Sequence, residues 1–179
     1  MSEARIESGR AAILLDVDGV LNPLHTGKPS PTHISHLLRP KIFPGLPAAV
    51  VHVWLDPDHG RQLRELAEAT GAELVWATAW EHEAARLVAP ILGLPSMAAI
   101  TFGVHGTHRQ DGHHGKTVAV TRWAGDRPIC WFDDDFVAAD HDWAARRTAD
   151  GAPTLLIPVE PDIGLRAEHP ARARAFLLA

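Results

Sequence analysis

Short apolar runs recur along the chain and alternate with segments of helical spacing. The runs cover residues 11–15, 50–55, 72–80, 97–102, 128–132 and 154–157, and the helical segments cover 60–70, 81–92, 139–150 and 165–178. Continuous apolar runs of this length are typical of strands buried on both faces of a parallel sheet. The alternation predicts an α/β fold, with a central parallel sheet of about five strands and helices on both faces.

Residues 23–47 interrupt this alternation with prolines at 23, 29, 31, 40, 44 and 47. Proline fixes φ and removes a backbone donor, so the segment predicts a long ordered loop, with one helical turn around 34–38. The loop carries the basic and imidazole side chains His25, Lys28, His33, His36, Arg39 and Lys41. They either face an anionic substrate or form a solvated surface, and the pattern leaves both interpretations open.

Composition limits the classes of protein to which the chain can belong. At 179 residues with 46% apolar and 22% charged side chains, it predicts one globular domain over 11–179. The net charge of −5 gives no general attraction to nucleic acid, although a local basic patch stays open. The single cysteine, Cys130, excludes an intrachain disulfide and suits the cytoplasm. Residues 1–10 predict a flexible leader without signal-peptide character, and no apolar stretch predicts a membrane span.

Acidic residues follow two of the apolar runs. Asp16 and Asp18 come directly after the first run and Gly19 then permits a sharp turn, while Asp133, Asp134 and Asp135 follow the run 128–132. Residues i and i+2 of a strand point to the same side. Two carboxylates about 4 Å apart repel by roughly 4 kcal/mol at an effective dielectric near 20, so a cation or a shared proton is expected. The alternatives are an acidic turn and a helix N-cap, and a cap explains one acid better than three.

Three further groups are candidates for chemistry. Thr78 lies near the end of the run 72–80, and Lys116 is one of only three lysines in the chain. The segment Gly115-Lys116-Thr117 is not a P-loop, because position 110 is glutamine where that motif needs glycine. The loop 103–115 carries His105, His108, His113 and His114, whose spacing matches no zinc pattern. A solvated or substrate-facing loop is therefore the favoured interpretation.

Taken in order, these residues resemble the four motifs of the haloacid dehalogenase (HAD) superfamily, which implies a Rossmann-like three-layer sandwich. The resemblance implies that Asp16 is the nucleophile, that Asp18 is the acid/base, and that Thr78 and Lys116 contact the phosphoryl group. It also implies Mg²⁺ held by Asp16, the Asp18 backbone carbonyl and Asp133. Asp134 would brace Lys116 or the metal. The third acid leaves open whether the fourth motif is the pair 133/134 or the pair 134/135.

The phrases Asp-Val-Asp-Gly-Val-Leu-Asn-Pro and Val-Trp-Ala-Thr-Ala-Trp-Glu-His-Glu look most like the HAD domains grouped with Swiss Army Knife RNA repair proteins. This implies a phosphomonoesterase for RNA or nucleotide phosphate ends. A phosphatase of small metabolites and a non-catalytic metal- or phosphate-binding module are the alternatives. No large cap domain is expected, only a flap within 23–55, and no obligate protein partner is evident.

Tryptophans supply a last expectation. Trp80 or Trp54 would lie at the mouth of the site and stack on a base, with a core position as the alternative for Trp80. Trp76 and Trp131, within apolar runs, are expected in the core.

Overall fold

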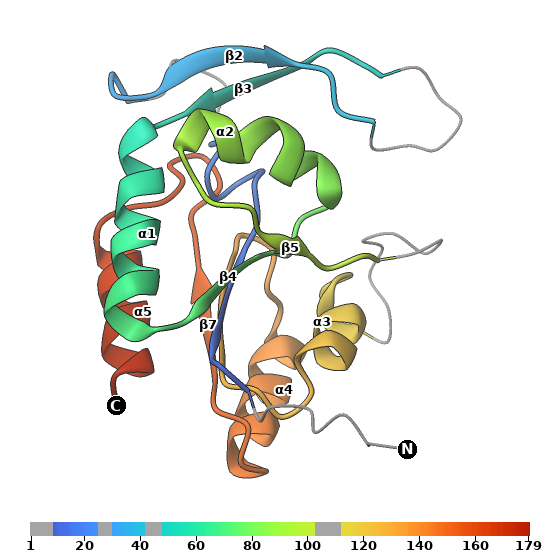
Figure 1. Cartoon of the computed structure of the whole chain (residues 1–179). Helices are drawn as coiled ribbons and strands as arrows, with labels where there is room; N and C mark the ends of the chain where they lie inside the picture. Colours follow the sequence, from blue (N-terminus) through green and yellow to red (C-terminus); the bar gives the residue numbers. More distant parts are fainter. Residues whose placement is uncertain (1–8, 25–29, 42–47, 103–111) are drawn as a thin grey trace, which may run out of the picture.

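The computed structural model describes residues 9–24, 30–41, 48–102 and 112–179. Its centre is a parallel sheet of five strands in the order β5-β4-β1-β6-β7 (Figure 1). The strands are β1 (Ala12–Leu15), β4 (Glu73–Trp76), β5 (Ala98–Ala99), β6 (Ile129–Asp133) and β7 (Thr154–Pro158). The predicted α/β fold with a central parallel sheet is confirmed, and the strand that comes first in the chain lies in the middle of the sheet.

Helices cover both faces of this sheet. They are α1 (Pro57–Thr70), α2 (Ala89–Leu92), α3 (Thr117–Ala124), α4 (Ala138–Ala149) and α5 (Glu168–Leu177), with a π-helical segment η1 (Ala84–Val88) leading into α2. Buried side chains of α1, η1, α2 and α5 share one core cluster, and those of α3 and α4 share the other. In Figure 1, α1 and α5 lie side by side, away from α3 and α4. The molecule is thus a three-layer sandwich.

The two cores meet at β1, whose four residues are all completely buried. Ile13 and Leu15 face the core under α1, while Ala12 and Leu14 face the core under α3 and α4. Successive strand residues point to opposite faces, so only a continuous apolar run can fill both. This run places the residue that follows it, Asp16, at the centre of one sheet edge.

A separate two-stranded antiparallel ribbon joins β2 (Ile34–Leu38) to β3 (Val51–Leu55). The helical turn predicted around 34–38 is wrong, because these residues pair in register with β3, from Ile34 opposite Leu55 to Leu38 opposite Val51. Long-range pairing overrides the local pattern here. The ribbon is attached to the domain through the backbone N–H of Trp54, which donates to Asn22 Oδ1 at 2.8 Å.

Other elements differ from the prediction at their ends. Helix α1 begins at Pro57, three residues before the predicted start, because Asp56 caps it by accepting from the Asp58 N–H. Gly71 ends α1 in the left-handed conformation, as expected of a C-cap glycine. The predicted helix 81–92 begins as a π-helical segment, and the predicted strand 97–102 pairs over only two residues.

Some expectations concern residues outside the described ranges. They include most of the leader 1–10 and parts of the Pro-rich segment, with His25 and Lys28, together with His105 and His108. Between β1 and β4 the described residues form the ribbon and α1. None of the helices in the described part of the chain combines the length and the apolar character needed to cross a bilayer.

Candidate functional site

Three polar residues lie together at the carboxyl ends of adjacent strands. Asp16 follows β1 directly, Thr78 lies two residues beyond β4, and Asp133 is the last residue of β6. Because β4 and β6 flank β1 in a parallel sheet, their carboxyl ends meet at one edge. Asp16 is 7% exposed, and the other two are fully buried. The Thr78 hydroxyl lies close enough to Asp16 to lower the pKa of that carboxyl group.

Lys116, the N-cap residue of α3, also contacts this edge of the sheet. Its ammonium group donates to Asp16 Oδ2 and, at 2.7 Å, to Asp133 Oδ2. The carboxylate of Asp140 in α4 anchors the start of α3 by accepting from the Thr117 hydroxyl at 2.8 Å and from the His114 N–H at 3.1 Å. Lys116 is thus the bridge between two strand ends, held in place by a neighbouring helix.

Burial and charge act against each other in this triad. Burial raises the pKa of Asp16 to about 7, although the Lys116 ammonium works in the opposite direction. Burial would also raise the pKa of Asp133, but Lys116 and His114 outweigh it and hold that pKa well below its usual value. Burial disfavours the charged form of Lys116, yet the two carboxylates raise its pKa. The Lys116 ammonium group therefore forms an ion pair with each of the two carboxylates.

Asp134 completes a cluster that fits a divalent cation. Asp16, Asp133 and Asp134 each offer a carboxylate oxygen, and these oxygens lie within 4.8 Å of one another. Burial, and then the charge of Asp133, raises the pKa of Asp134. Three carboxylates (−3) and the Lys116 ammonium (+1) leave a formal charge of −2, which a divalent ion would neutralise. An all-oxygen donor set of this kind suits Mg²⁺.

Gly19 is the residue that lets Asp134 approach. Its φ of +76° lies in the left-handed region, and a Cβ built there would come within 2.3 Å of Asp134 Cγ. Asp135, by contrast, has a largely exposed side chain and does not belong to the cluster formed by the described residues. The geometry therefore favours 133/134 over 134/135 as the fourth-motif pair.

Asp18 lies beside this cluster, but uncharged groups hold it. Its Oδ1 accepts from Asn22 Nδ2 at 2.7 Å, and its Oδ2 accepts from the indole Nε1 of Trp80 at 2.8 Å. The Asp18 carboxylate is not part of the three-carboxylate cluster. The part of Asp18 that remains a candidate metal ligand is its backbone carbonyl, as the sequence resemblance implies.

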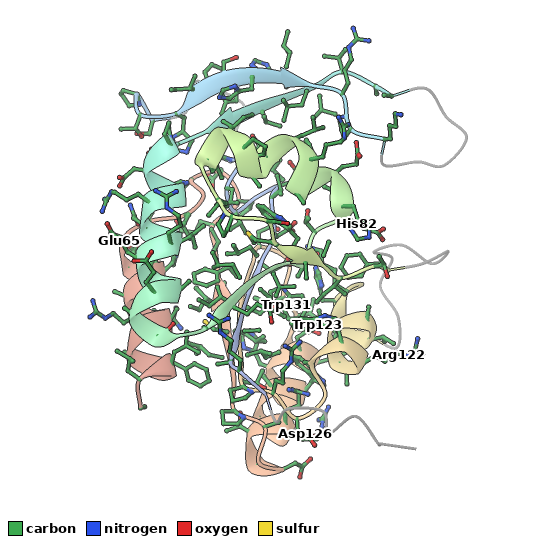
Figure 2. All side chains as sticks on the ribbon, viewed as in Figure 1. Glu65, His82, Arg122, Trp123, Asp126 and Trp131 are labelled. Carbon is green, nitrogen blue, oxygen red and sulfur yellow. The ribbon has the colours of Figure 1, made fainter. Side chains whose placement is uncertain are left out.

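The base-stacking role predicted for Trp80 does not fit this arrangement. The side chain is only 1% exposed, so it has no free face for a base, and its core alternative is the one that the structure supports. Trp54 is half-buried on β3 and lies 5.0 Å from the His52 ring. Trp76 and Trp131 are fully buried, as predicted. Figure 2 shows Trp131 inside the molecule, whereas Glu65, Arg122 and Asp126 lie at the outer surface.

A strained turn carries both Thr78 and Trp80. The Glu81 N–H donates to the Thr78 carbonyl at 2.9 Å, and the Glu83 N–H donates to the Trp80 carbonyl at 2.9 Å. Glu81 has a φ of 47°, and it is the one described non-glycine residue with positive φ. Such a conformation costs about 1–3 kcal/mol and recurs at functional sites. Its strain is consistent with a turn shaped for the site.

His114 is the main site residue that sequence reasoning placed wrongly. It was expected in a solvated or substrate-facing loop, but it is 4% exposed. Its Nδ1 accepts from the Lys116 N–H at 3.2 Å, so in the neutral ring the proton lies on Nε2, 3.3 Å from Asp133 Oδ1. His114 thus supports Asp133, and the local sequence, rich in glycine and histidine, gave no sign of this burial.

Comparisons with known proteins agree with this geometry. A family model described as the HAD domain in Swiss Army Knife RNA repair proteins matches residues 12–169. The matched range runs from β1 into α5 and contains all the site residues above. Neither the curated proteins nor the solved structures yield a match.

Proposed function

The chain belongs to the family of HAD domains in Swiss Army Knife RNA repair proteins, and on this premise we propose that it is a magnesium-dependent phosphomonoesterase. The family supports hydrolytic phosphatase chemistry in general. The finer proposal is an aspartyl phosphate on Asp16 and a substrate with a phosphate end, carried by RNA or by a nucleotide. The observation that carries it is the contact of Lys116 with Asp16 and Asp133 at the edge of the sheet.

The nucleophile in this proposal is Asp16. A nucleophilic carboxylate must be ionised, and the Lys116 ammonium stabilises that form against burial. The Val17 N–H donates to Asp16 Oδ1 at 2.7 Å and fixes the carboxylate plane. Lys116 and the Thr78 hydroxyl would also meet negative charge on the transferring phosphoryl group.

The acid and base in this proposal is Asp18. As an Asp16 oxygen forms its bond to phosphorus, the ester P–O bond breaks and Asp18 gives its proton to the leaving oxygen. Asp18, now a carboxylate, then takes a proton from water while the water oxygen attacks phosphorus and the bond to Asp16 breaks. Proton transfer of this kind contributes about 10²–10⁴-fold to the rate.

Mg²⁺ would be held by carboxylate oxygens of Asp16, Asp133 and Asp134 and by the Asp18 carbonyl. When bound, the ion supplies charge neutralisation at the phosphate and at the three carboxylates. The residues of the chain then need only keep these carboxylates in place, which Lys116, His114 and Gly19 do by contact.

The substrate class rests on the family description and on the site's surroundings. The family is named for RNA repair proteins, which favours phosphate ends of nucleic acids or nucleotides. The described chain between β1 and β4 supplies a ribbon and a helix, and a site without a large cover suits a phosphate on a large molecule. The buried free cysteine, Cys130, suits the reducing conditions of the cytoplasm, where we propose that the protein acts.

A phosphate-release assay tests the proposal. The panel contains an aryl phosphate, mononucleotides, sugar phosphates, and oligonucleotides carrying 5′- or 3′-phosphate, each with Mg²⁺ and with a chelator. We expect Mg²⁺-dependent release from the aryl phosphate and the fastest release from oligonucleotide or nucleotide ends. A preference for sugar phosphates would identify a metabolite phosphatase. No release from any compound, with phosphate binding retained, would indicate a non-catalytic module.

A further inference from the structure

Trp80 is the one buried tryptophan whose indole N–H meets a candidate catalytic group. Its Nε1 lies 2.8 Å from Asp18 Oδ2, a partner 62 residues earlier in the chain. The other buried tryptophans, Trp76, Trp131 and Trp143, have indole nitrogens with no hydrogen-bond partner among the described residues. The fold therefore tolerates an unpaired indole nitrogen at three buried positions. The hydrogen bond from Trp80 thus points to a role at Asp18 and not to a general need of buried indoles.

We infer that Trp80 is a positioning residue that sets the orientation of the Asp18 carboxyl group for proton transfer. The inference rests on the proposed function, in which Asp18 is the acid and base. An indole N–H donates a hydrogen bond but does not ionise near neutral pH and has no lone pair to accept a proton, so it can neither supply nor take up the transferred proton. Its role in the reaction would be to hold the carboxyl group in place.

The two donors on Asp18 fix the plane of its carboxyl group. Asn22 donates to Oδ1 at 2.7 Å and Trp80 donates to Oδ2 at 2.8 Å. A carboxylate offers about four lone-pair sites. Two of them face donors, so a proton taken up by Asp18 must use one of the remaining directions. The pair of donors thereby selects the direction in which the proton is delivered.

Trp80 is itself held firmly enough for this task. The side chain is 1% exposed, and its backbone N–H lies 3.3 Å from the Thr78 hydroxyl oxygen. The Thr78 hydroxyl in turn lies close enough to Asp16 to lower its pKa. One short turn therefore carries, two residues apart, a side chain beside each acid of the first motif. The turn fixes not only Asp18 but also its placement relative to the nucleophile.

The test compares Trp80→Phe with Trp76→Phe. Both substitutions replace a buried indole by a smaller phenyl ring, but only Trp80→Phe removes a hydrogen bond. For Trp80→Phe we expect kcat on a nucleoside monophosphate to fall about 10- to 100-fold, as for one hydrogen bond lost by a charged group. On an aryl phosphate with a weakly basic leaving group, kcat should fall less than about threefold, because that group needs little protonation. Trp76→Phe should show no such contrast.

A series of aryl phosphates with leaving groups of rising pKa sharpens the readout. In Trp80→Phe, log kcat should fall more steeply with leaving-group pKa than in the wild type. Equal losses across the series would show that Trp80 supports the fold alone and would overturn the inference. Unchanged activity toward every substrate would overturn it as well.

A second variant keeps the test decisive if Trp80→Phe does not fold. Site-specific replacement of the Trp80 indole by benzothiophene keeps the two-ring shape and removes only the N–H donor. The same contrast between alkyl and aryl phosphates is expected, and its absence contradicts the inference.

An independent measurement separates this inference from the proposed function. In ¹H–¹⁵N spectra, Asp18→Ala should shift the indole resonance of Trp80 and leave that of Trp76 in place. If the wild type hydrolyses no phosphate ester, the proposed function fails, while this spectrum still reports whether Trp80 holds Asp18. If hydrolysis is present and the Trp80 resonance does not move, the inference alone fails.

Discussion

Asp16 and Asp18 are two residues apart, yet the regions that hold them differ in kind. Asp16 belongs to a charged region, where Lys116 bridges it to Asp133. Asp18 belongs to a region of neutral donors, where Asn22 and Trp80 each occupy one of its oxygens. A fixed ammonium stabilises an anion, which suits a nucleophile that must stay ionised. Neutral donors orient a carboxyl group without adding a cation, which suits a residue that must gain and lose a proton.

The two regions also draw on different parts of the fold. The charged region joins β1, β6 and the start of α3, and its members are all buried. The neutral region joins the loop after β1 to the strained turn after β4, and through Asn22 it reaches the β2–β3 ribbon. The position of Asp16 therefore depends on the sheet and the start of α3. The position of Asp18 depends on the two turns and, through Asn22, on the β2–β3 ribbon.

The largest effect should come from removing the nucleophile in the charged region. Asp16→Asn keeps the shape of the side chain but removes the attacking oxyanion, so phosphate release should fall to background for aryl and alkyl phosphates alike. Initial rates with Mg²⁺, on protein shown by circular dichroism to be folded, would measure this. Turnover that persists in Asp16→Asn would exclude the covalent mechanism.

In the neutral region, Asp18→Asn should lower kcat on nucleotides much more than kcat on aryl phosphates. The nucleophile remains and the proton donor is lost, so kcat on nucleotides should fall by about 10²–10⁴-fold, while aryl phosphates with good leaving groups should lose much less. Steady-state kinetics on one substrate of each kind would measure the ratio. Equal losses would point to a structural role for Asp18 and remove the contrast between the two regions.

The free energy of unfolding should also differ between variants of the two regions. Lys116→Met leaves the buried carboxylates of Asp16 and Asp133 without their cation, so the free energy of unfolding should drop by about 3–5 kcal/mol. Asp18→Asn keeps one acceptor oxygen but places an amide NH₂ against the second donor, so one hydrogen bond is lost and the free energy of unfolding should fall by only about 1–3 kcal/mol. Urea denaturation without added metal would measure both. Similar losses in the two variants would show that the ammonium is not the main support of the charged region.

The smallest effect should come from the turn between the regions. Gly19→Ala introduces a left-handed alanine, which costs roughly 1–2 kcal/mol, and its Cβ would clash with Asp134. Gly71→Ala is the matched control, because Gly71 has φ of +67° and a Cβ there meets nothing within 4 Å. Both variants carry the cost of the left-handed conformation, but only Gly19→Ala displaces Asp134, so only Gly19→Ala should need more Mg²⁺ for half-maximal activity. An unchanged Mg²⁺ requirement would remove Asp134 from the metal site.

Much of this architecture followed from local pattern. The apolar run of β1 required a strand buried on both faces, and Asp16, Asp18 and Gly19 follow it within four residues. Gly71 directly follows the helical segment predicted at 60–70 and ends α1, because a left-handed φ at a C-cap favours glycine whatever surrounds it. Such features depend on a few neighbouring residues, so the sequence alone was enough to predict them.

Tertiary structure decided which partner each polar group meets. Residues 34–38 become a strand only because β3 pairs with them. Lys116 could have braced any of the acids after β6, and the position of α3 directs it to Asp133. Trp80 reaches Asp18 across 62 residues. Sequence determined which chemical groups stand at the strand ends, whereas their pairing depends on long-range packing, which no local window of residues contains.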